Sequence, residues 1–113
     1  MRVKKAEAGI AIEEGSGNVY ADLGFRDASE MLVKARLAHE IGELIQNRRI
    51  TQQEAAEVLG MPQPKISDML RGNFRGISQA RMIECLNRLG RDVDIVVKKA
   101  GRRVVGRTQV VVA

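Results

Sequence analysis

The stretch TQQEAAEVLGMPQPKISDMLR, residues 51–71, decides the fold that this sequence predicts. Thr51 is followed three residues later by Glu54, which is the pattern of a capping box at a helix N-terminus. Gly60 can supply the positive φ that a tight turn between two helices needs. Ala56 is small enough for a second helix to pack closely against the first. The stretch therefore predicts two helices joined by a short turn at Gly60.

The second of these helices, from about Pro62 to Leu70, has one apolar face and one outward face. Ile66 and Met69/Leu70 recur at spacings of three and four and form the inward face. The outward face carries short or polar side chains that can enter a groove, namely Gln63, Pro64, Lys65, Ser67, Asp68 and Arg71. This division of faces is typical of a helix-turn-helix that binds DNA.

The sequence on either side predicts two more helices. Asp27, with a glutamate three residues later, marks the start of a long helix that ends near Arg48. Gly42 within this helix allows another backbone to approach closely. Ser78 is the expected N-cap of a fourth helix, which Gly90 ends. The expected fold is therefore mainly α.

After the fourth helix the pattern changes to β-branched residues. The run VDIVV at 93–97 predicts one short C-terminal β-strand, and the valines at 104–105 and 110–112 allow a second. An isolated hairpin is marginal in water. The predicted strand therefore either lies against the helices or pairs with a strand of another chain.

The chain divides into three expected parts, which are a flexible N-terminal arm over 1–25, a helix-turn-helix domain over 26–90, and a strand with a basic tail over 91–113. The net charge is +5 at pH 7. Residues 48–81 carry six Lys and Arg against three Asp and Glu, and residues 91–113 carry six against two. A basic surface of this kind favours a polyanionic partner.

The composition argues against several classes of function. Cys85 and His39 are each the single residue of their type, which excludes an internal disulfide and a Cys- or His-rich zinc site. Cys85 is expected to pack as a small apolar residue. No set of nucleophile, base and orienting group is visible, so we expect neither an enzyme nor a cofactor. No apolar run could span a membrane and no signal-type segment follows the basic start, so we expect a cytoplasmic setting.

The outward face supplies candidate contacts to double-stranded DNA. Glutamine can bond an adenine edge and lysine a guanine edge, so Gln63, Lys65 and Ser67 are candidates to read bases. Pro64 cannot hydrogen-bond through its side chain, and Asp68 would repel phosphate. Phosphate contacts are expected at the start of the first helix and after the second, from Gln52, Gln53, Arg71, Asn73 and Arg75.

These residues resemble the helix-turn-helix of the Cro/phage-repressor (XRE) family. Thr51-Gln52 is similar to that family's helix start, and Gln63 is similar to the glutamine that opens its recognition helix and reads a base. The structural positions of the family are filled by Ala56, Gly60 and Ile66. The resemblance covers residues 36–89 and implies a lambda-repressor-like helical bundle.

A wider resemblance covers about residues 17–99. GNVYADLG at 17–24 and LGRDVDIVV at 89–97 are similar to a HigA-like antitoxin branch of the family. This resemblance implies an autorepressor that binds its own operator as a dimer and neutralises a RelE/HigB-like toxin.

Two functions of different classes follow as expectations. The first is a sequence-specific DNA-binding repressor, a homodimer whose recognition helices enter successive major grooves about 34–36 Å apart. The second is a protein-interaction module that neutralises a small basic toxin through residues 1–25 or 91–113, with DNA binding secondary. The dimer interface is expected at residues 92–97, with the fourth helix as the alternative.

Overall fold

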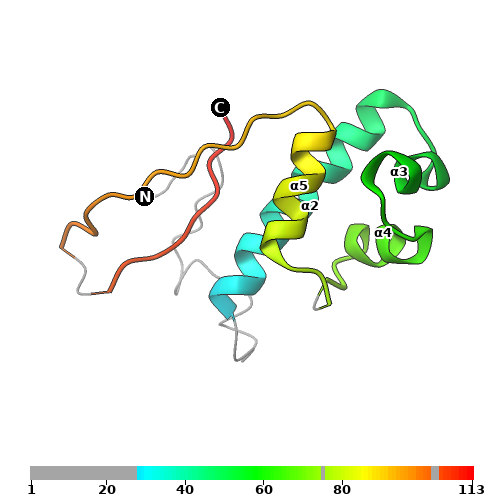
Figure 1. The fold of residues 1–113 in the computed structure, drawn as a ribbon. Helices are drawn as coiled ribbons and strands as arrows, with labels where there is room; N and C mark the ends of the chain where they lie inside the picture. Colours follow the sequence, from blue (N-terminus) through cyan, green and yellow to red (C-terminus); the bar gives the residue numbers. More distant parts are fainter. Residues whose placement is uncertain (1–27, 75, 103–104) are drawn as a thin grey trace. The chain divides into compact units, whose positions relative to one another are not determined.

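The computed structural model describes residues 28–74, 76–102 and 105–113, and they contain four helices (Figure 1). These are α2 (Ala28–Arg48), α3 (Gln52–Leu59), α4 (Gln63–Leu70) and α5 (Gln79–Arg88). All four predicted helices are confirmed. Asp27, the expected N-cap of α2, and the expected arm over 1–25 lie outside the described residues.

The helix termini form where local side chains satisfy the backbone. Thr51 Oγ1 accepts a hydrogen bond from the amide of Glu54 at 3.0 Å, and Glu54 Oε1 accepts one from the amide of Thr51 at 2.8 Å. The predicted capping box of α3 is thus confirmed. Gly60 ends α3 with φ 65°, the left-handed conformation expected of it. Ser78 caps α5 by accepting from the amide of Arg81 at 3.0 Å.

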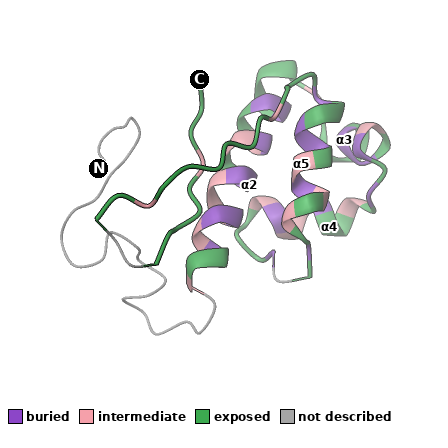
Figure 2. Cartoon of the chain, turned by 60° about the vertical axis from the view of Figure 1, so that its left-hand side comes forward, coloured by how far each residue is buried: buried purple, intermediate pink, exposed green. Residues whose placement is uncertain are grey.

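Residues 34–99 form one compact unit, and its core lies between the helices. α3 packs against both α4 and α5. Figure 2 shows buried positions alternating with exposed ones along each helix, as amphipathic helices require. The fully buried side chains come from all four helices and include Ile41, Leu59, Ile66, Met69, Met82 and Cys85. The predicted inward face of α4 is therefore confirmed at Ile66 and Met69, and Leu70 is half-buried.

Three contacts tie α2 to the rest of this unit. A Cβ at Gly42 would lie 3.3 Å from Cδ2 of Leu70 on α4. The close neighbour is therefore a side chain, where the sequence suggested a backbone. Arg48 donates to the carbonyl of Leu89 at 3.0 Å, and the buried Lys34 donates to the carbonyl of Phe74 at 3.4 Å. These two bonds connect α2 to the end of α5 and to the loop that follows α4.

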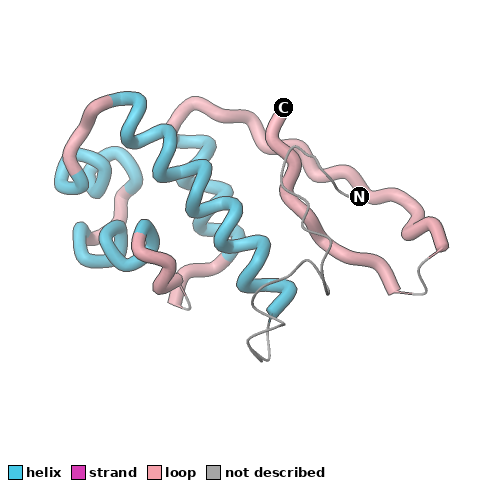
Figure 3. Tube along the Cα trace, turned by 180° about the vertical axis from the view of Figure 1, so that it is seen from behind, coloured by secondary structure: helices cyan, strands magenta, loops and turns pink. Residues whose placement is uncertain are grey.

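The described part of the tail, residues 91–102 and 105–113, contains no strand (Figure 3). The strand predicted at 93–97 is therefore not found in the single chain. Ile95, Val96 and Val97 are 79%, 77% and 91% exposed, so they do not lie against the helices. A strand needs a second backbone that accepts and donates its hydrogen bonds. Packing against the helices does not supply such a backbone, whereas pairing with a strand of another chain does.

Among the described residues, no helix combines the length and the apolar character that crossing a membrane requires.

Candidate nucleic-acid interface

The outward face of α4 lies opposite two fully buried anchors. Ile66 and Met69 are each 0% exposed and turn this helix so that its other side meets solvent. Of the predicted contact residues on α4 and its end, Pro64, Lys65 and Arg71 are exposed, and Gln63, Ser67 and Asp68 are partly exposed. Gln52, Gln53 and Asn73 are also exposed. Arg75 lies outside the described residues.

The first turns of α3 and α4 are joined by their glutamines. Gln63 Nε2 donates a hydrogen bond to Gln52 Oε1 at 2.9 Å. Both residues are predicted from the sequence to contact DNA, but the bond between them is not. The bond limits the rotamers of both side chains and holds two amide groups together at one edge of the helix-turn-helix.

The end of α4 carries an ion pair. Arg71 donates to Asp68 Oδ1 at 2.6 Å, three residues earlier along the chain. The Asp68 carboxylate, expected to repel phosphate, is thus compensated by a guanidinium group in direct contact. Asp68 and Arg71 therefore present much less net charge to a neighbouring molecule than either residue would alone.

Two further bonds attach α4 to the loop that follows it. The amide of Asn73 donates to the carbonyl of Asp68 at 2.8 Å. Lys65 Nζ lies 3.5 Å from the carbonyl oxygen of Gly76, at the limit for a hydrogen bond. Lys65 therefore points along the flank of α4 toward the loop, away from the Gln63 end of the outward face.

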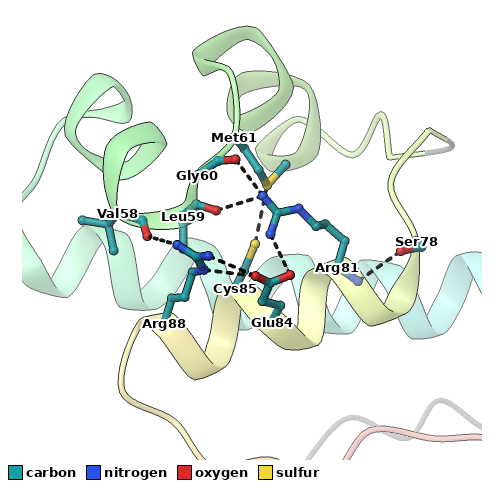
Figure 4. Close-up of polar contacts among 9 residues, drawn as sticks. All are labelled: Val58, Leu59, Gly60, Met61, Ser78, Arg81, Glu84, Cys85 and Arg88. Carbon is teal, nitrogen blue, oxygen red and sulfur yellow. Dashed lines mark hydrogen bonds and ion pairs between the residues drawn. The ribbon is translucent and has the colours of Figure 1, made fainter.

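A cluster of charged side chains on α5 holds the turn between α3 and α4 (Figure 4). Arg81 donates to the carbonyl oxygens of Leu59 at 2.9 Å and Gly60 at 2.8 Å. Arg88 donates to the carbonyl of Val58 at 3.3 Å. The last carbonyls of a helix lack intrahelical partners and carry partial negative charge, so guanidinium groups stabilise this end of α3.

Glu84 lies between the two arginines on α5. Its carboxylate contacts Arg81 at 2.9 Å and Arg88 at 3.2 Å. The Arg81 charge is the main reason that the pKa of Glu84 lies below its usual value, and hydrogen bonds from both arginines act in the same direction. Glu84 thus orients both guanidinium groups toward the turn.

Cys85 lies on the buried side of the same helix. Its Sγ is 3.5 Å from Sδ of Met61, the first residue after the turn glycine. Burial raises the pKa of the thiol, so it stays protonated and unreactive at neutral pH. The expectation that Cys85 packs as a small apolar residue is confirmed.

The sequence reasoning missed Arg81, Glu84 and Arg88. Their spacing of three and four residues signals ion pairs within one helix. It does not signal that the arginines reach carbonyl groups 21 to 30 residues away in the sequence. Among the described residues, no group of three or more His, Cys, Asp or Glu side chains could hold a metal ion.

The chain is similar to known proteins over most of its length. A family model described as a helix-turn-helix domain matches residues 19–98. A solved chain, whose name assigns it provisionally to the XRE family of transcriptional regulators, is 40% identical to this one. The similarity covers 77% of this chain and 99% of that chain, with a TM-score of 0.72. No curated protein matches the chain.

Proposed function

The chain belongs to the helix-turn-helix domain family, and on this premise we propose that it is a sequence-specific, double-stranded DNA-binding transcriptional regulator that acts as a repressor. The observation that carries the proposal is the outward face of α4, held by two buried anchors, with Gln63 at its first residue. α4 is the recognition helix of this proposal, and it lies in the major groove with its N-terminal end toward the bases.

Gln63 reads a base in this arrangement, and Gln52 supports it. A glutamine amide can donate and accept at the two atoms that adenine shows in the major groove. Because Gln52 Oε1 accepts from Gln63 Nε2, the Gln63 side chain is partly ordered before DNA arrives. Less conformational entropy is then lost on binding.

Polar residues at the ends of α3 and α4 hold the protein to the backbone of the duplex. Gln52 and Gln53 lie in the first turn of α3, where backbone amides and side chains can meet a phosphate. Arg71 and Asn73 lie just beyond α4 and serve the same purpose at its other end. Lys65 adds positive charge along the flank, and Ser67 lies within the base-reading part. Binding therefore weakens as the salt concentration rises.

Gln63→Ala tests the base-reading role. We expect operator affinity to fall by roughly five- to a hundredfold, because one good base contact contributes about 1–3 kcal/mol of discrimination. Affinity for random DNA should hardly change. The operator would first be located by footprinting on the DNA upstream of the gene, and titrations on both DNAs would follow.

Gln46→Ala is the matched control, because it removes an exposed glutamine from α2. Its affinity for both DNAs should equal that of the unmodified protein. An equal loss on operator and random DNA for Gln63→Ala would contradict base reading. Absence of any DNA binding by the unmodified protein would contradict the proposed function itself.

A second candidate function is neutralisation of a small basic toxin of the RelE/HigB type. It is favoured by the large apolar side chains left exposed in the second half of the tail, such as Val105, Val111 and Val112. A toxin encoded beside the gene should stop growth when it is expressed alone, and expressing this chain together with it should restore growth. Changing the three valines to serine should abolish this rescue. Unchanged rescue by the triple variant would exclude the valines as the toxin-binding surface.

A further inference from the structure

Asp68 occupies an unusual place for a carboxylate. It lies in the last turn of α4, where the partial negative charge of the helix end disfavours an acidic side chain. It also lies on the outward face, which the proposed function turns toward a polyanion. Its side chain is 40% exposed, so burial does not hold it there. Neither helix stability nor attraction to phosphate therefore accounts for this residue.

The position of Asp68 is central to the outward face of α4. Pro64, Asp68 and Arg71 follow one another at spacings of four and three residues, so they form one line along the helix. Ile66 and Met69, which are fully buried, lie on the opposite side. Pro64 is exposed and has no polar side-chain atom. The polar groups on this line are therefore those of Asp68 and Arg71.

The ion pair leaves one oxygen of the Asp68 carboxylate open to a further donor. Arg71 donates to Oδ1 at 2.6 Å, and no described residue donates to Oδ2. An ionised carboxylate accepts through both oxygens, so Oδ2 keeps its capacity as an acceptor. The guanidinium group also offsets the negative charge of the carboxylate. Asp68 therefore meets less repulsion beside phosphates than an unpaired carboxylate would.

Cytosine is the base that best fits such an acceptor. Its N4 amino group is a donor in the major groove, and it lies beside one acceptor, O6 of the paired guanine. Thymine and guanine show only acceptors there, and these repel a carboxylate. Adenine shows an amino group, but acceptors lie on both sides of it, namely its own N7 and O4 of the paired thymine. A carboxylate is therefore more favourable at cytosine than at any other base.

We propose that Asp68 is a second base-reading residue of α4, which selects cytosine by accepting a hydrogen bond from its N4 amino group, while Arg71 holds and neutralises the carboxylate. The inference rests on the proposed function, because it needs α4 to lie in the major groove. Asp68 is five residues from Gln63, or about 7.5 Å along the helix. Base pairs are about 3.4 Å apart, so the two residues read positions roughly two base pairs apart.

An operator scan with Asp68→Asn tests this assignment. The operator, located by footprinting, is varied at each position to all four base pairs, and affinities are measured at one salt concentration. The unmodified protein should prefer cytosine over thymine at one position of each half-site by roughly five- to a hundredfold. Asparagine keeps the size of the side chain, but its amide also donates, so the variant should lose most of this preference. The preference at the position that Gln63 reads should not change.

Glu57→Gln is the matched control, because it removes an exposed carboxylate from α3. Both variants should bind random DNA more tightly than the unmodified protein does, since each removes one negative charge. Only Asp68→Asn should change the relative affinities for the four bases. Circular dichroism of both variants should match that of the unmodified protein, which separates a change in base reading from a loss of fold.

A gain in affinity of the same size at all four bases would overturn the proposal, because Asp68 would then act through its charge alone. A preference for cytosine that survives Asp68→Asn, or a preference for adenine at that position, would also overturn it. In each of these cases the protein still selects an operator, so the proposed function stands. If the unmodified protein selects no operator, both the proposed function and this inference fall.

Discussion

Replacing Phe74 with alanine is expected to lower the free energy of unfolding by about 3–5 kcal/mol. Among the described residues, Phe74 is the largest fully buried side chain, and it is 1% exposed. It lies between α4 and α5, and its carbonyl accepts the hydrogen bond from the buried Lys34 at 3.4 Å. Truncation would leave a cavity beneath the loop and loosen the end of α4. Urea unfolding followed by circular dichroism measures the change.

Asn73→Ala is the control for this prediction, because Asn73 is the exposed neighbour of Phe74. Its effect should stay within about 0.5 kcal/mol. Domains of this size are typically stable by about 5–15 kcal/mol, so Phe74→Ala would remove a large fraction of the total. A loss below about 1 kcal/mol would show that Phe74 is not part of the packed core.

Arg81→Met is expected to lower the free energy of unfolding by about 1–3 kcal/mol. The substitution keeps most of the apolar stem but removes two charge-assisted hydrogen bonds to the turn and the ion pair with Glu84. The carbonyls of Leu59 and Gly60 would lose these donors. Hydrogen exchange should therefore speed up in the turn between α3 and α4, and thermal unfolding would give the stability change.

Arg88→Met provides the comparison for Arg81→Met. Arg88 makes one bond of 3.3 Å to the same end of α3, and its side chain is more exposed. Arg88→Met should therefore lower the free energy of unfolding clearly less than Arg81→Met does. Equal losses for the two variants would mean that the ion pairs with Glu84, and not the bonds to the turn, carry the effect.

The helices could be predicted from the sequence because their signals are local. Thr51 with Glu54, Gly60, and Ser78 each act within four residues of their own position, and the structure confirms all of them. The buried face of α4 follows from the helical period alone. Arg49 shows the limit of such signals, because it adopts φ 57° after α2 where glycine or asparagine is usual.

Side-chain partners could not be predicted in the same way. The burial of Lys34 depends on a carbonyl 40 residues later, and the bonds of Arg81 depend on the path of the chain through the turn. The outward face of α4 was predicted, but the bonds Gln52–Gln63 and Asp68–Arg71 were not. The prediction for the tail failed for a different reason. Its β-branched residues favour an extended backbone, but a strand also requires a second backbone to pair with.

The ion pair at the end of α4 gives Arg71 an internal counter-ion before any DNA is present. DNA affinity falls with salt because each neutralised phosphate releases condensed cations, with a slope of about −0.9 per phosphate in log units. An arginine that keeps its carboxylate partner contributes little to that release. The slope should therefore be shallower than the number of basic side chains at the interface suggests. If the proposed function holds, we therefore expect Asp68 to make operator occupancy less sensitive to ionic strength and to reduce the non-specific affinity.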